Sequence, residues 1–297
     1  VTPPNATVKV ARYIEDKRQR LHLGPELQLP PSNKHTLPLE RGSYLVTINA
    51  PGYAEVRYPV LLGRGEHYPV DLKMPKSEAI PPGFVYIPPG RFVFGTQLDE
   101  TTRKTFLTAV PSHVMKSSSY MISKYETTFG EWIEYLNSLS PQERIKKSGV
   151  ILKGSLAGAI GLKQLPDGLW QLSLQPQLAQ FVVKEGDIIS YIGRARNEKQ
   201  DWRQMPATGM DKNDTQDYLN WLVTHKKLRG ARLCSETEWE RAARGADERE
   251  YPNGNEIDGS EANIDETYGK DASTTGPDEV GRHPETRSPF GVDDMAG

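Results

Sequence analysis

The most informative stretch of this sequence is ARLCSETEWERAARG, residues 231–245. Within it, Ser235 and Glu238 have the spacing of a capping box, in which a hydroxyl and a carboxylate satisfy backbone N–H groups at a helix start. Trp239 lies on the face that carries the following alanines, and Gly245 is a typical helix end. We therefore expect a helix that begins after Ser235, ends at Gly245 and buries Trp239.

Two further segments carry helix start signals. Thr128 and Glu131 form a second capping box ahead of Trp132, whose spacing to the next leucines is that of an apolar helix face. Asp211 is a typical N-cap residue ahead of a segment that includes Trp221. The sequence therefore predicts one helix after Thr128 and another after Asp211.

The first part of the chain has the pattern of β-structure. Residues 6–14, ATVKVARYI, alternate in character with period two, and residues 42–49, GSYLVTIN, read as another strand. Residues 68–74, YPVDLKM, are expected to form a last strand. Several short strands with turn signals between them predict a small antiparallel β-sandwich over residues 1–75.

Prolines and glycines then mark a boundary. Residues 76–83 contain two prolines and a glycine, which predict a linker. Residues 84–95, FVYIPPGRFVFG, read as a β-hairpin that turns at the Pro-Pro-Gly sequence. Residues 141–203 lie between the first two predicted helices, and we expect them to form a β-rich decoration, with alternation clearest in residues 165–174.

Composition excludes several classes of function. The chain has 37 basic and 39 acidic residues, so charge gives no reason to expect a nucleic-acid partner or an anionic membrane surface. No apolar run approaches the roughly 20 residues that span a bilayer. The single cysteine, Cys234, allows no intrachain disulfide. Because Val1 is not an initiator Met, we expect both ends to be cuts in a longer polypeptide.

A series of ordered motifs resembles the formylglycine-generating-enzyme, or sulfatase-modifying factor, family. The motifs are FVYIPPGRFVFG at 84–95, PSHV at 111–114, YMISKYETT at 120–128, MPATGMD at 205–211, ARLCSETEWERAARG at 231–245, YPNG at 251–254, AN at 262–263 and SPFGVDDMAG at 288–297. The resemblance implies an α+β fold of the C-type-lectin-like kind over residues 84–297, incomplete at its C-terminal end.

The N-terminal part resembles a different module. Residues 42–53, GSYLVTINAPGY, are similar to the core of PEGA-type β-modules. A PEGA-like module followed by this domain resembles the C-terminal region of certain bacterial serine/threonine protein kinases. That resemblance implies a kinase domain in cis before residue 1, and an unknown protein or small-molecule ligand as partner. The compartment stays open between the cytoplasm and the extracytoplasmic face of a bacterial membrane.

Three functions follow from the resemblance: a non-catalytic ligand-binding or regulatory module, a sulfatase-maturing oxidase, and a nonheme-iron oxidoreductase of the same superfamily. The family's oxidases use two copper-binding cysteines, which would lie downstream of residue 297. We therefore assign no catalytic residue and expect no copper site in this fragment. Cys234 replaces the family's proline before the helix, and we expect it to be a buried structural thiol.

Histidines give little support to the iron chemistry. The six histidines are scattered without ligand spacing. Only His113 falls within a family motif. We expect His113 to be a hydrogen-bonded residue beside a strand rather than a metal ligand.

Calcium is the metal that the resemblance favours. Family members hold calcium at the AN and DMxGN motifs, so Asn263, the Ile264 carbonyl and Asp271 would form one site. Asp294 and the Gly297 carbonyl would begin a second. These are oxygen donors of the kind that calcium takes. The alternative is that the same side chains only make turn hydrogen bonds, as Asn and Asp commonly do.

Overall fold

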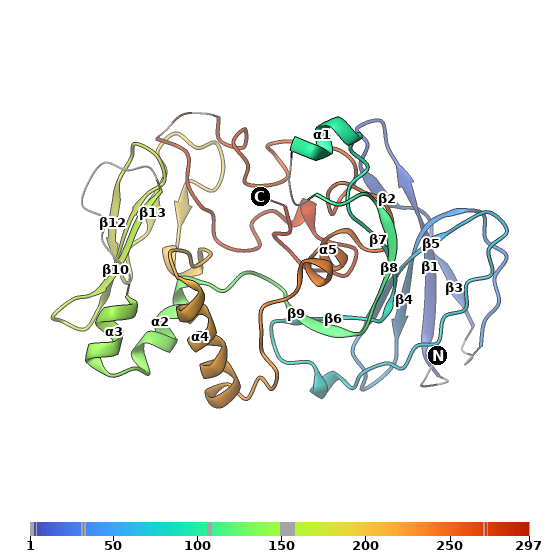
Figure 1. Cartoon of the computed structure of the whole chain (residues 1–297), viewed down its shortest axis with the longest axis horizontal. Coiled ribbons are helices and arrows are strands. Elements are labelled where there is room, and N and C mark those ends of the chain that lie inside the picture. The colour runs from blue at the N-terminus through green and yellow to red at the C-terminus, as the bar shows by residue number, and fades with distance from the viewer. Residues whose placement is uncertain are drawn as a thin grey trace. The chain divides into compact units, whose positions relative to one another are not determined.

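The computed structural model describes residues 3, 5–30, 32, 34–105, 109–148, 158–269, 271 and 273–296. Its elements fall into two compact units (Figure 1). The first unit combines Val1–Lys124 with Cys234–Ile257 and Glu285–Ala296, and the second combines Tyr125–Leu233 with Asp258–Pro284. The division between the units therefore does not fall at the predicted linker, residues 76–83.

The first unit begins with one antiparallel sheet. Its strands are β1 (Thr7–Glu15), β2 (Leu21–Leu23), β3 (Leu27–Leu29), β4 (Gly42–Asn49) and β5 (Val56–Leu62). The order is β2-β1-β4-β5, with β3 also paired to β1 (Figure 1). The strands of the described residues before residue 77 thus form a single sheet, whereas we expected a sandwich.

Extended segments cover the apolar face of this sheet in place of a second sheet. Val8 and Ile48 are buried on that face, where Leu72 and Met74 pack against them. The expected strand at residues 68–74 is wrong: this segment is extended but forms no strand ladder. Pro69 lacks the N–H group that a central strand position requires.

Polar contacts attach the opposite face of the sheet to later parts of the same unit. Ser43 donates a hydrogen bond from its hydroxyl to the Asp247 carboxylate. Arg57 Nε donates to the Pro289 carbonyl oxygen at 2.8 Å. The N-terminal sheet is therefore packed within the first compact unit and not set apart from it.

The predicted hairpin at residues 84–95 is wrong in its pairing. The strand β6 (Phe84–Ile87) pairs with β9 (Tyr120–Ser123), and β7 (Gly90–Phe94) pairs with β8 (His113–Ser117). Two prolines lie between β6 and β7. A two-residue hairpin turn needs positive φ, which the proline ring forbids.

The helix expected after Ser235 is confirmed as α5 (Glu236–Arg244), and both hydrogen bonds of the capping box are present. Gly245 follows it with φ of 80°. The expected burial of Trp239 is wrong, because 46% of this residue is exposed. Trp239 lies in the first turn, next to exposed residues 232–236, and only the later part of the helix, around Ala242, packs into the apolar cluster.

The second unit contains the other two predicted helices and the insert. The predicted helices are α2 (Phe129–Asn137) and α4 (Lys212–His225), and the insert begins with a helix that was not predicted, α3 (Pro141–Lys147). The strands are β10 (Ala159–Gln164), β11 (Trp170–Gln175), β12 (Phe181–Lys184), β13 (Ile189–Ser190) and β14 (Lys199–Gln200). Thr128 caps α2 with a complete capping box, and Asp211 caps α4. Both predicted helix starts are confirmed.

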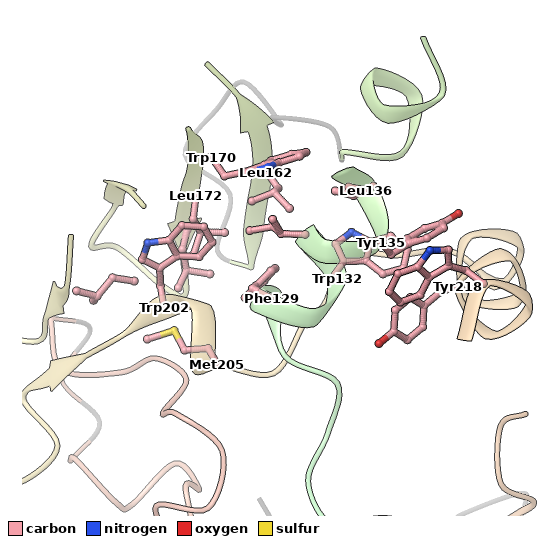
Figure 2. Packing of buried hydrophobic residues seen from close by; sticks show 14 of the residues in the cluster. Phe129, Trp132, Tyr135, Leu136, Leu162, Trp170, Leu172, Trp202, Met205 and Tyr218 are labelled. Carbon is pink, nitrogen blue, oxygen red and sulfur yellow. The ribbon is translucent and has the colours of Figure 1, made fainter. Parts of the chain in front are cut away.

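The insert is β-rich as expected, but it is part of the core rather than a decoration. Figure 2 shows Trp170 and Leu172, from β11, in one cluster with Phe129 and Trp132 of α2. Trp170 also donates from Nε1 to Asn137 Oδ1 at 3.0 Å. The insert and α4, through Tyr218 and Trp221, together bury the apolar face of α2.

The remaining elements are short. They are α1 (Glu100–Thr105) and the 3₁₀ turns at Ser77–Ala79, Trp202–Gln204 and Pro284–Thr286. No helix within the described residues is both long and apolar enough to cross a membrane.

Candidate functional site

The loop of residues 258–278 contains the residues that were predicted to form the first calcium site, and the Arg196 side chain fixes its start. Arg196 Nη1 donates to the Ser260 carbonyl oxygen at 2.5 Å, and Nη2 donates to the Gly259 carbonyl oxygen at 2.8 Å. A Cβ at Gly259 would stand 2.8 Å from the Glu266 backbone. Only glycine fits this close approach.

A second arginine fixes the end of the same loop. Arg194 Nη1 donates to Asp278 Oδ1 at 2.6 Å, and both side chains are almost fully buried. Arg194 also donates to the carbonyl oxygens of Thr274, at 2.5 Å, and Gly276, at 2.7 Å. A buried charge is costly unless it is paired and hydrogen-bonded, and the Arg194 guanidinium meets both conditions.

Asp278 connects further residues of this loop. Its Oδ2 accepts a hydrogen bond from the Tyr268 hydroxyl and lies 2.8 Å from His283 Nε2. Burial, followed by the hydrogen bond to Asp278, raises the pKa of Tyr268 to about 12. The Tyr268 ring also stacks on Arg194, whose guanidinium carbon is 3.7 Å from the ring centroid. No local pattern predicts this network, because Arg194 and Asp278 are 84 positions apart.

A cavity of about 300 Å³ lies beside this network. Its walls include Asn263, Ile264, Asp265, Tyr268, Thr275 and Gly276. Three of these residues can offer oxygen ligands: the Asn263 amide, the Ile264 carbonyl and the exposed Asp265 carboxylate. Asn263 Nδ2 donates to the Gly276 carbonyl oxygen at 3.0 Å, which orients the amide and leaves its Oδ1 for another partner. Such a donor set suits calcium, which takes 6–8 oxygen ligands including waters.

Asp271, the predicted charged ligand, is not among the residues that line this cavity. Its Oδ1 accepts hydrogen bonds from Ser273 N and Ser273 Oγ, each at 2.8 Å. These bonds, that from the backbone foremost, lower the pKa of Asp271. Asp271 therefore makes the turn hydrogen bonds that are expected if it is not a calcium ligand.

The second predicted calcium site has one described member. Asp294 belongs to the first compact unit and adopts a positive φ of 54°, whereas Gly297 lies outside the described residues. Within the part of the chain that the structure describes, no three His, Cys, Asp or Glu side chains gather into a metal-binding group.

The two remaining candidate residues are Cys234 and His113. Cys234 is exposed, which corrects the expectation of a buried thiol. The residue lies in the exposed segment ahead of α5 instead of in its packed part. His113 Nδ1 lies 2.8 Å from the Pro111 carbonyl oxygen, and its ring meets the Phe94 ring edge-on at 5.6 Å. The interpretation of His113 as a hydrogen-bonded residue beside a strand is confirmed.

Comparison with known families agrees with the motifs. Residues 71–297 match the family described as the sulfatase-modifying factor enzyme 1-like domain. The match covers more than half of the chain, which therefore belongs to this family. It begins ahead of the predicted domain start at residue 84. A search of curated proteins returns no match.

Proposed function

We propose that this domain is a non-catalytic ligand-binding or regulatory module, and that calcium bound at residues 258–278 stabilises its recognition surface. The observation that carries the proposal is the cavity of about 300 Å³ that contains Asn263 and Asp265. The buried pair of Arg194 and Asp278 supports its wall. A loop held by buried ionic contacts is suited to present ligands in fixed positions.

The calcium ligands in this proposal are the Asn263 amide oxygen, the Ile264 carbonyl oxygen and one carboxylate, from Asp265 or Asp271. Waters supply the remaining coordination. A site with one charged ligand belongs at the weak end of the usual range, with Kd about 10⁻⁴ to 10⁻³ M. Asp294 and Gly297 would begin a second site of the same kind.

Family membership favours a second candidate function, that of a sulfatase-maturing oxidase. The copper of such an oxidase requires two thiolates, and this chain contains one cysteine, Cys234. The residues present therefore do not fit that copper site, and we derive no reaction step through it.

The partner in the proposed function is a protein or small molecule. The resemblance of residues 42–53 to a PEGA-type module supports placing the domain downstream of a bacterial serine/threonine kinase. In that arrangement, ligand binding here would regulate the kinase. The sequence that precedes residue 1 tests this part of the proposal directly.

Whether this chain acts as a sulfatase-maturing oxidase can be tested directly. The purified chain is incubated with copper, oxygen, a reductant and a peptide carrying the cysteine of a sulfatase, and the products are analysed by mass spectrometry. We expect no more than one formylglycine per chain, and the same result for Cys234→Ser. Multiple turnovers by the parent chain would overturn the non-catalytic assignment in favour of the oxidase.

A further inference from the structure

A largely apolar cavity lies on the covered face of the N-terminal sheet. Its volume is about 460 Å³, within the roughly 300–1,000 Å³ of typical small-molecule sites. The floor consists of alternate residues of three neighbouring strands, including Val8, Val10, Val46, Ile48 and Val60. Because side chains alternate along a strand, these residues form one continuous apolar surface.

The walls of this cavity are irregular segments that hydrogen-bond to tyrosines of the sheet. The Tyr44 hydroxyl donates to the Glu40 carbonyl oxygen at 2.9 Å, which holds one wall. On the other wall, the Tyr68 hydroxyl lies 3.3 Å from that of Tyr58. These bonds hold the walls at the edges of the apolar floor, and the space between them stays open.

Basic and titratable groups gather among the wall residues. Lys34, His35 and His67 all line the cavity, together with the acidic Glu66. Arg91 binds the Glu66 carboxylate through two hydrogen bonds, at 2.5 and 3.1 Å, so that its charge is compensated. No carboxylate among the described residues pairs with Lys34. The uncompensated charge beside the apolar floor is therefore positive.

One residue that lines the cavity also has a buried polar atom without a partner among the described residues. His35 Nε2 is shielded from solvent and has no hydrogen-bond partner among the described residues. A buried polar atom in this state costs about 1–3 kcal/mol unless it is satisfied. An occupant whose anionic head lies beside Lys34 would compensate this charge, and a turn of the His35 ring would bring Nε2 to the same head.

We infer that this cavity binds a single-chain amphiphile with an anionic head, such as a fatty carboxylate. Its alkyl chain lies on the apolar floor around Val46, and its carboxylate lies beside Lys34 and His35. This cavity shares no residue with the proposed calcium loop, so each proposal can be tested without the other.

The test compares three ligands with the same chain length and different heads. Decanoate, decanol and decyltrimethylammonium are titrated calorimetrically into the full chain, each below the concentration at which it aggregates. We expect decanoate to bind with one molecule per chain and more tightly than either of the others. Absence of decanoate binding, or equal binding of the cation, would overturn the inference. These outcomes need no variant.

Two pairs of variants locate the site. Val46→Phe fills the floor and should abolish decanoate binding, whereas Val114→Phe, at a position that is 60% exposed on β8, should not change it. Lys34→Gln should weaken decanoate about two- to fivefold, as expected of one exposed ion pair, and leave decanol unchanged. Lys73→Gln, an exposed lysine that does not line the cavity, is the control. Full binding by a folded Val46→Phe protein would contradict the placement.

Discussion

Arg194 and Asp278 form a buried ion pair, with Nη1 donating to Oδ1 at 2.6 Å. Arg194 follows strand β13, and Asp278 ends the loop that carries Asn263. The pair therefore links the insert of the family domain to the proposed calcium site. This contact explains how a segment that the sequence presents as an insertion supports the loop that is proposed to bind calcium.

The first prediction concerns this pair. Asp278→Asn should lower the free energy of unfolding by about 3–5 kcal/mol, because it leaves the buried Arg194 charge without its carboxylate. Glu134→Gln breaks the exposed pair with Lys226 and should cost about 0–1 kcal/mol. Urea unfolding followed by tryptophan fluorescence compares the two. Equal effects would show that the buried pair does not stabilise the unit.

The second prediction tests whether the insert is core. Leu172 is fully buried, so Leu172→Ala should cost about 2–5 kcal/mol of unfolding free energy. Leu178, in the same insert, is 83% exposed, and Leu178→Ala should change stability by less than about 0.5 kcal/mol. The same urea experiment measures both. If the Leu172→Ala protein were as stable as the parent, the insert would not be part of the core.

The third prediction compares how much the N-cap of α5 and the exposed Trp239 of the same helix each contribute to stability. Ser235→Ala removes a complete capping box and should cost about 0.5–2 kcal/mol. Trp239→Ala should cost clearly less than the about 3–5 kcal/mol of a fully buried tryptophan, because Trp239 is 46% exposed. Chemical denaturation followed by far-UV circular dichroism measures both. A loss of several kcal/mol at Trp239 would mean that this side chain is packed after all.

The fourth prediction is a pH dependence. The hydrogen bonds from Arg91, followed by that from Gly63, lower the pKa of Glu66 to about 2, against about 4.3 for an ordinary glutamate. The stabilising contribution of this pair is therefore complete above the ordinary pKa and is lost as the pH falls towards 2. NMR titration of the Glu66 carboxyl should give a midpoint near 2. A midpoint at the ordinary value would contradict the pairing.

Local signals in the sequence were sufficient for α2, α4 and α5, whereas α1 and α3 were not predicted, although α3 begins with a complete capping box. A capping box acts over three residues, so Thr128 and Ser235 could be identified without knowledge of the fold. Strand pairing was harder to predict from the sequence. The partner of β6 is β9, 33 to 39 positions away, and the Pro-Pro sequence at 88–89, which was interpreted as the turn of a hairpin, in fact excludes a direct one.

The site could be predicted only in part. The family motif identified Asn263 and Ile264, which line one cavity. The residues that support the cavity, Arg194 and Asp278, come from segments 84 positions apart. No spacing rule connects them, and His283 was treated as one of several scattered histidines. Networks of this kind depend on tertiary contacts that a single sequence does not encode locally.

Calcium binding tests the central proposal most directly. At ten times Kd, binding to the folded state alone adds about 1.4 kcal/mol to the free energy of unfolding, enough to shift a melting curve. Thermal melts of the parent are compared in millimolar calcium, in magnesium at the same concentration, and in chelator. Magnesium controls for ionic strength, because it demands a smaller and more regular site.

The variants Asn263→Ala, Asp265→Asn and Asp271→Asn are measured in the same way. We predict a calcium-dependent rise in the melting temperature of the parent, and its loss in Asn263→Ala and in the variant of whichever aspartate supplies the charged ligand. No calcium-dependent shift in the parent, or a full shift in Asn263→Ala, would contradict the calcium site at residues 258–278.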